Sequence, residues 1–259
     1  MITLPPDLVP PVNSEVRKVY TLRWCLALGV TLPAIALVAA TVTSVLAGPA
    51  DPKSALATGT ATIGLYLALA ATILAAAVFG AAGAGGEFRY RTMPVTSLFT
   101  ADRDRLAAAK LLVTGAYTLA VTVLVEVCAF ACLLAFGRGK FEFGTRLLTV
   151  FGTGLLAAVC WSLLGAGLGL LLRQSTGAVA LILGWLLVFE PLVWLVANGI
   201  GLGGVVTLLP GSATVATVAV GSFPDSDILA PTPAAFVVLL LWTIGIAGAG
   251  WWQLRGRDM

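Results

Sequence analysis

Two carboxylic acids, Glu126 and Glu190, lie inside long apolar runs of the sequence. An ionised carboxylate in hydrocarbon costs roughly 2.5–3.5 kcal/mol on insertion scales, so both side chains must face protein or water. Pro191 follows Glu190 and removes a backbone donor, which predicts a kink beside a cavity. Two interpretations stay open for each acid: contact with a polar or cationic ligand, or a neutral acid hydrogen-bonded to a neighbouring helix. The indoles considered for such a bond belong to Trp161, Trp185 and Trp194.

The other residue types that usually do chemistry are scarce or badly placed. Histidine is absent, which removes the commonest general base and the commonest metal ligand. The four cysteines lie in apolar stretches, where a thiol behaves as a small hydrophobic group. The sequence Gly-Arg-Gly-Lys at 137–140 lacks the spacing and the hydroxyl of a phosphate-binding loop. We therefore predict no catalytic residues, no metal site and no cofactor in this chain.

The composition is that of a membrane protein. Of the 259 residues, 59% are hydrophobic and 10% are charged, against roughly 45–50% and 25% in soluble domains. The mean hydropathy is +1.01, and a net charge of +3 is too small to indicate nucleic-acid binding. Six apolar runs predict an all-α membrane protein with six transmembrane helices. The predicted spans are 24–47, 58–82, 106–136, 147–172, 176–197 and 234–254, followed by a tail at 255–259.

The segments outside the spans predict further helices. Residues 1–23 are expected to form a tail and then an interfacial amphipathic helix that begins at Asn13 or Ser14. The glycine-rich, apolar segment 198–233 contains stretches too short to cross the membrane, which predicts a pair of short helices packed on the protein. Small residues spaced by four allow close helix approach; they include Gly165 with Gly169, Gly199 with Gly203, and Gly245 with Ala249.

The connection between the second and third spans is dense in charge. The helical pattern that follows it, from Arg103 to Phe136, would be about 51 Å long, longer than the ~30 Å hydrocarbon core, so one end projects. Asp102 is a predicted cap for this helix. The basic residues here either meet lipid phosphates or form a docking surface. Eleven basic residues fall on the side of the N-terminus and four on the other, which predicts that both termini are cytoplasmic.

Two motifs flank this connection. Gly-Glu-Phe-Arg-Tyr-Arg-Thr occupies 86–92, and Thr-x-x-Arg-x-Arg-Leu-x-Ala-x-Lys occupies 100–110. Together with six spans and an N-terminal interfacial helix, they resemble the permease subunit of a bacterial ABC-2 type ABC transporter. The resemblance implies a coupling helix in this connection, inserted into a separate ATPase subunit. The residues that it assigns to coupling are Glu87, Arg89, Arg91, Leu98, Phe99, Arg103, Asp104 and Arg105.

The same resemblance implies an ATP-driven exporter of the bacterial plasma membrane. Two permease subunits, identical or homologous, would form the substrate pathway, and their ATPase subunits would bind ATP and magnesium. Segment 198–233 would then be an external helical pair, and Glu126 and Glu190 would lie in the pathway. An alternative of another class is an ion-coupled secondary transporter in which these two acids relay protons. A third is a structural or sensory membrane partner.

Overall fold

The structure is a computed structural model that describes residues 5–49, 58–89, 102–220, 222, 226 and 228–256. Within these ranges every regular element is a helix, and six helices are long and apolar enough to cross a membrane. The chain is therefore a multi-pass membrane protein, as the sequence predicted. Five of these spans contain α2 (Arg23–Leu46), α3 (Ile63–Arg89), α5 (Arg103–Phe136), α6 (Thr145–Leu172) and α11 (Thr232–Gly256).

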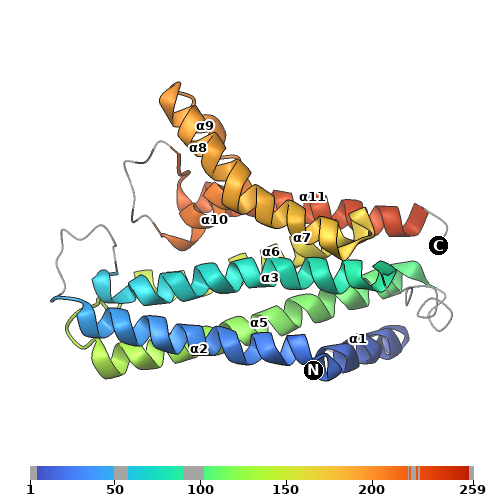
Figure 1. Ribbon diagram of the computed structural model, residues 1–259, viewed down its shortest axis with the longest axis horizontal. Coiled ribbons are helices and arrows are strands. Elements are labelled where there is room, and N and C mark those ends of the chain that lie inside the picture. The colour runs from blue at the N-terminus through green and yellow to red at the C-terminus, as the bar shows by residue number, and fades with distance from the viewer. Residues whose placement is uncertain are drawn as a thin grey trace.

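The remaining span is interrupted. It consists of α7 (Ser175–Gly184), a π-helical stretch (Trp185–Phe189) and α8 (Glu190–Gly199). The π-helical stretch lies just before Pro191, at the position where the sequence predicted a kink. The segment after this span contains two short helices, α9 (Gly203–Val206) and α10 (Pro210–Val218). Figure 1 shows α8 and α9 leaning away from α3.

Two helix ends differ from the predictions. The second span continues to Arg89 instead of ending at 82. The glycines near its end do not break the helix, and one of them is a close-packing position: a Cβ on Gly85 would lie 2.6 Å from the backbone nitrogen of Ser175. The N-terminal helix α1 (Val9–Thr21) begins four residues before the predicted Asn13, with prolines in its first turn. Proline is tolerated there because first-turn N–H groups have no acceptor within the helix.

The core of the bundle is built on α6, which packs on α3 and α11 through glycines. A Cβ on Gly165 would overlap the carbonyl oxygen of Ala77 in α3, and Gly169 faces Ala81 in the same helix. On another face of α6, a Cβ on Gly167 would lie 2.6 Å from the Cα of Ala247 in α11. The close approach predicted for the first glycine pair is therefore present. In contrast, no described atom lies within 4 Å of a Cβ built on Gly245.

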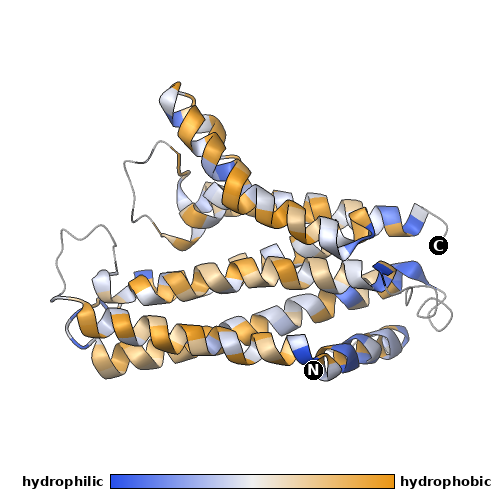
Figure 2. Ribbon diagram, in the orientation of Figure 1, coloured by the Kyte–Doolittle hydropathy of each residue, from blue (hydrophilic) through white to orange (hydrophobic). Residues whose placement is uncertain are grey.

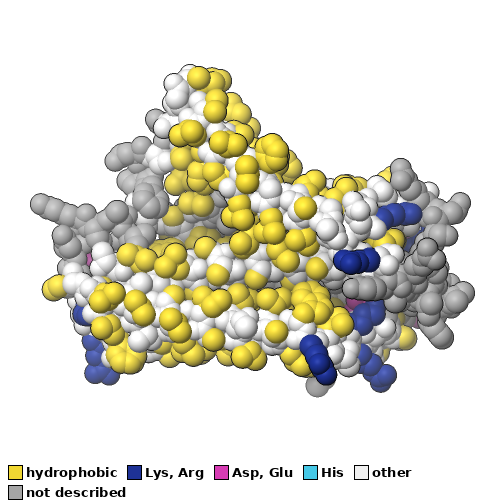
Figure 3. All heavy atoms as spheres, in the orientation of Figure 1, with side chains coloured by type: hydrophobic (Ala, Val, Ile, Leu, Met, Phe, Trp, Pro, Cys, Tyr) yellow, Lys and Arg dark blue, Asp and Glu magenta, His cyan; other side chains and the backbone are white. Residues whose placement is uncertain are grey.

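Charge is concentrated at one end of the molecule. Figure 2 shows the hydrophilic positions gathered around α1, the end of α3, the start of α5 and the end of α11, and we call this the basic end. Figure 3 shows hydrophobic side chains covering the middle of the visible face. The described basic residues at the basic end are Arg17, Lys18, Arg23, Arg89, Arg103, Arg105, Lys110, Arg173 and Arg255. Those at the opposite end are Arg138, Lys140 and Arg146.

Candidate functional site

Four charged side chains from three helices form an ion cluster at the basic end, in which Lys18 is half-buried and the other three side chains are buried. Glu15 and Lys18 come from α1, Glu87 from α3 and Lys110 from α5. The Lys110 Nζ lies 3.0 Å from Glu15 Oε2 and 2.7 Å from Glu87 Oε1. Lys18 Nζ contacts both carboxylates as well. Lys110 is only 3% exposed, so the cluster replaces water as the partner of its charge.

The sequence of α1 explains how the cluster assembles. Its apolar residues Val12, Val16 and Val19 share one face and pack on α5. Glu15 and Lys18 are three positions apart, so the same packing carries both toward α3 and α5. An isolated buried charge costs several kcal/mol, but two carboxylates and two ammonium groups leave the cluster neutral. The ion pairs of the cluster join α1 to the end of α3 and the start of α5, which flank segment 90–101 in the sequence.

The electrostatics of Lys18 reflect this arrangement. Burial lowers its pKa, but the neighbouring carboxylates of Glu15 and Glu87 more than offset that effect. The pKa of Lys18 therefore lies above its usual value of 10.5. The ammonium form is the one that the folded protein favours.

Two of the residues that the resemblance assigns to coupling, Asp104 and Arg105, form polar contacts with residues of other elements. Asp104 accepts a hydrogen bond from Trp251 Nε1 at 2.8 Å and lies 3.8 Å from Arg255 Nε, both in α11. Arg105 forms ion pairs at 3.1 Å with Asp7 and Asp102.

The other residues assigned to coupling lie in several places. Glu87 belongs to the ion cluster, Arg89 is the last residue of α3 and Arg103 is the first residue of α5. Arg91, Leu98, Phe99 and the predicted coupling helix lie outside the described residues. Asp102 caps α5 as predicted, since its side chain accepts from the backbone N–H of Asp104 at 2.9 Å.

Sequence reasoning missed the roles of Glu15 and Lys110. The sequence places Glu15 on the N-terminal amphipathic helix and Lys110 at the end of the second motif, and it indicates a partner for neither residue. The available signal was the position of each charge on an otherwise apolar helix face, because such a charge requires a partner. Which partner it meets depends on tertiary packing.

A second polar arrangement surrounds Glu190, which is 1% exposed. Its Oε1 accepts from the backbone N–H of Ser212 at 2.6 Å, and its Oε2 accepts from Trp185 Nε1 at 3.0 Å. The N–H of Ser212 lies in the first turn of α10, so Glu190 of α8 caps that helix from outside. A negative charge at a helix N-terminus is favourable because the free N–H groups point at it. The Trp194 indole lies near the same carboxyl without a hydrogen bond of normal geometry.

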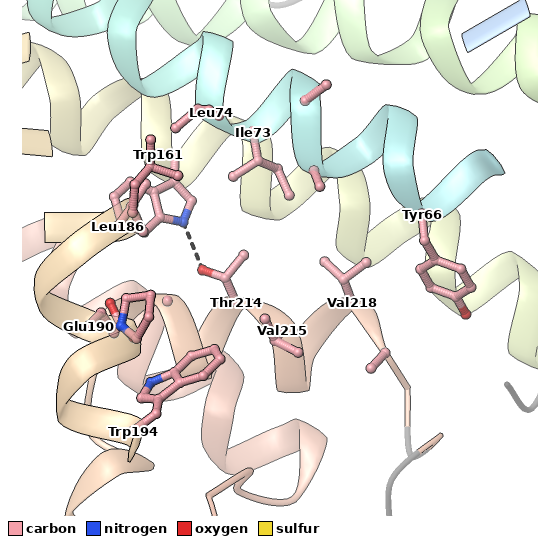
Figure 4. A pocket seen from close by; sticks show the side chains of 16 residues that line it. Tyr66, Ile73, Leu74, Trp161, Leu186, Glu190, Trp194, Thr214, Val215 and Val218 are labelled. Carbon is pink, nitrogen blue, oxygen red and sulfur yellow. Dashed lines mark hydrogen bonds between the residues drawn. The ribbon is translucent and has the colours of Figure 1, made fainter. Parts of the chain in front are cut away.

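Glu190 also borders a cavity of about 590 Å³ between α3, α6, α8 and α10. Figure 4 shows the lining side chains, with Trp161 of α6 and Thr214 of α10 joined across one side. Trp161 Nε1 donates to Thr214 Oγ1 at 2.7 Å. Two polar contacts, one from α6 and one from α8, thus hold α10 over the cavity.

The structure does not bring Glu126 and Glu190 together. Glu126 lies on α5, is 6% exposed and does not line the cavity. It faces α6, where a Cβ on Gly154 would lie 2.9 Å from Glu126 Oε1. This oxygen has no hydrogen-bond partner in the part of the chain that the structure describes. The two acids are therefore in different surroundings: one is a satisfied cap and the other is a buried carboxyl with an unpaired oxygen.

Comparison with known proteins adds no family to this geometry. No family model matches the chain, and no curated protein is similar to it in sequence. Within the described ranges, no three acidic or cysteine side chains gather as ligands of a metal ion would. The ion cluster, the capped helix and the cavity are thus the features from which function has to be argued.

Proposed function

We propose that this chain is the membrane-spanning permease subunit of an ATP-driven ABC exporter of the ABC-2 type. It forms the substrate pathway as a dimer and is driven by separate ATPase subunits that bind ATP and magnesium. The basic end faces the cytoplasm of a bacterium, with both termini on that side. The distribution of described basic residues, nine at that end and three at the other, supports this orientation.

The observation that carries the proposal is the ion cluster beside segment 90–101. A soluble motor that binds this segment can move the spans only if the helix ends beside it are stiff. Glu87 and Lys110 join those ends directly, and α1 is locked onto both. Asp104 adds a second brace to α11 through Trp251. A force on the segment would therefore reach four helices together, as a rigid-body transition requires.

The test is purification of the tagged full chain from its own membrane. We expect an ATPase with a phosphate-binding loop to co-purify in stoichiometric amount, and its hydrolysis rate to change when Arg103 and Arg105 are both replaced by Glu. The matched control is Arg146→Glu, an exposed position at the opposite end, which should leave the rate unchanged. Absence of any ATPase, or equal effects of the two variants, would contradict the proposal.

One observation favours the alternative of an ion-coupled secondary transporter. The Oε1 of Glu126 is buried inside the bundle and has no hydrogen-bond partner among the residues that the structure describes. Intramembrane acids of this kind often carry protons. That function requires uptake or efflux in ATP-free proteoliposomes driven by a pH gradient alone. Abolition of such flux by Glu126→Gln would support it over the ABC exporter.

A further inference from the structure

The cavity beside Glu190 is open toward the membrane. Leu187 lines it and is also 61% exposed, and the neighbouring Pro191 is exposed as well. Both belong to the span that leans away from α3. In a membrane-spanning helix an exposed side chain of this kind meets lipid. The opening of the cavity is therefore continuous with the hydrocarbon of the bilayer.

Apart from the indole N–H of Trp194, which has no acceptor among the described residues, the polar groups of the lining are engaged within the protein. Thr214 accepts from Trp161 and donates to the carbonyl oxygen of Pro210 at 2.6 Å. Both oxygens of Glu190 accept hydrogen bonds, and the Tyr66 hydroxyl lies 3.2 Å from Thr58 Oγ1. The rest of the lining is aliphatic or aromatic. A sugar, a peptide backbone or an ion would find few partners here, whereas an alkyl chain needs none.

We infer that this cavity binds an acyl chain of a glycerophospholipid, which enters from the bilayer between α3 and α8. The volume of about 590 Å³ lies within the ~300–1,000 Å³ typical of ligand sites. The Trp194 N–H is the one lining donor without an acceptor among the described residues, so water would find few polar partners in the cavity, and hydrocarbon is the favoured occupant. The inference names glycerophospholipids as the substrate class of the proposed exporter, and its transport role rests on that proposed function. Binding of the acyl chain is tested separately.

The experiment uses the full chain in nanodiscs that contain a phosphatidylcholine with a diazirine on one acyl chain. After irradiation, labelled positions are mapped by mass spectrometry. Trp161 is the reporter, because it lines the cavity but is only 2% exposed. A lipid that merely surrounds the protein cannot reach it. We expect label on Trp161 and on residues of α3 and α10 that face the cavity.

Two variants fill the cavity from opposite walls: Ala71→Phe on α3 and Val215→Phe on α10. Each should lower labelling of Trp161 by about tenfold, the change that corresponds to one decade in affinity. The matched control is Ala120→Phe, an exposed position on α5 outside the cavity, which should leave this label unchanged. Thermal unfolding of every variant shows whether it is folded, and one folded filling variant suffices.

The outcomes separate the inference from the proposed function. If Trp161 of the unmodified protein is labelled no more than background, the cavity does not bind an acyl chain. Unchanged labelling of Trp161 in a folded filling variant would overturn acyl-chain binding as well. Labelling as expected, without ATP-dependent movement of a fluorescent phospholipid by the complex with its ATPase, would keep the binding site and refute the transport role. Loss of both label and ATP-dependent movement in the filling variants would support the two together.

Discussion

The Lys110 ammonium group lies 2.7 Å from a carboxylate oxygen of Glu87, although the two residues belong to different spans on either side of segment 90–101. The same ammonium group also pairs with Glu15 of α1. One lysine therefore connects three helices at the basic end. Its removal leaves two buried carboxylates with Lys18 as the remaining cation of the cluster.

Lys110→Met is expected to destabilise the protein by about 3–5 kcal/mol, because removing one partner of a buried ion pair leaves an uncompensated charge. Thermal unfolding in detergent measures this loss. The double variant Glu87→Gln with Lys110→Met removes one charge of each sign and should lose less than the single variant. Arg146→Met, an exposed position, is the control. Equal losses for the single and double variants would show that the cluster does not act through its charge balance.

Stability at high pH should depend on Lys18. Its folded-state pKa lies above 10.5, so its contribution to stability is complete below that pH and is lost as the pH rises through the folded-state pKa. We expect the unfolding temperature to fall in this alkaline range. In Lys18→Arg the charge persists to higher pH, so the fall should begin later. Identical pH profiles for the two proteins would rule out a part for Lys18.

The six spans follow from local composition, because an apolar run of sufficient length can satisfy its backbone in a bilayer only as a helix. The ion cluster does not follow, since Glu15 and Lys110 are 95 positions apart and no local pattern pairs them. The same holds for Glu190. Trp185 was among the indoles considered for it, but its other partner is the N-terminus of a helix 22 positions away. The end of the second span could not be predicted either. A glycine such as Gly85 can end a helix or permit close packing, and the local sequence does not distinguish the two roles.

Glycine substitutions in two helices should have opposite consequences. A Cβ on Gly165 would overlap the carbonyl oxygen of Ala77, whereas a Cβ on Gly245 would meet nothing within 4 Å. Gly165→Ala is therefore expected to cost about 1–3 kcal/mol through overpacking. Gly245→Ala should be neutral or stabilising by up to about 1 kcal/mol, as helix propensity favours alanine. Thermal unfolding of the pair provides the comparison, and a larger loss for Gly245→Ala would contradict the packing of α6 on α3.

The cap on α10 can be tested at residue level by hydrogen exchange. Glu190→Leu removes the acceptor of the Ser212 N–H, and loss of a helix cap costs about 0.5–2 kcal/mol. The amides of α10 should therefore exchange faster. Glu190→Gln keeps an acceptor oxygen and should show a smaller change. Glu142→Leu, at an exposed site, should show none. Unaltered exchange in Glu190→Leu would mean that Glu190 does not stabilise α10.

Glu126 offers the sharpest separation of structural from functional roles. Its Oε1 is buried without a hydrogen bond in the described chain, and an unsatisfied buried group costs about 1–3 kcal/mol. Glu126→Met should therefore raise the unfolding temperature, while Glu142→Met on the surface should not. A stabilised variant that has lost transport would assign Glu126 to the pathway. If Glu126→Met is instead destabilised, the carboxyl has a partner in the assembled protein, and the proton-relay alternative loses its main support.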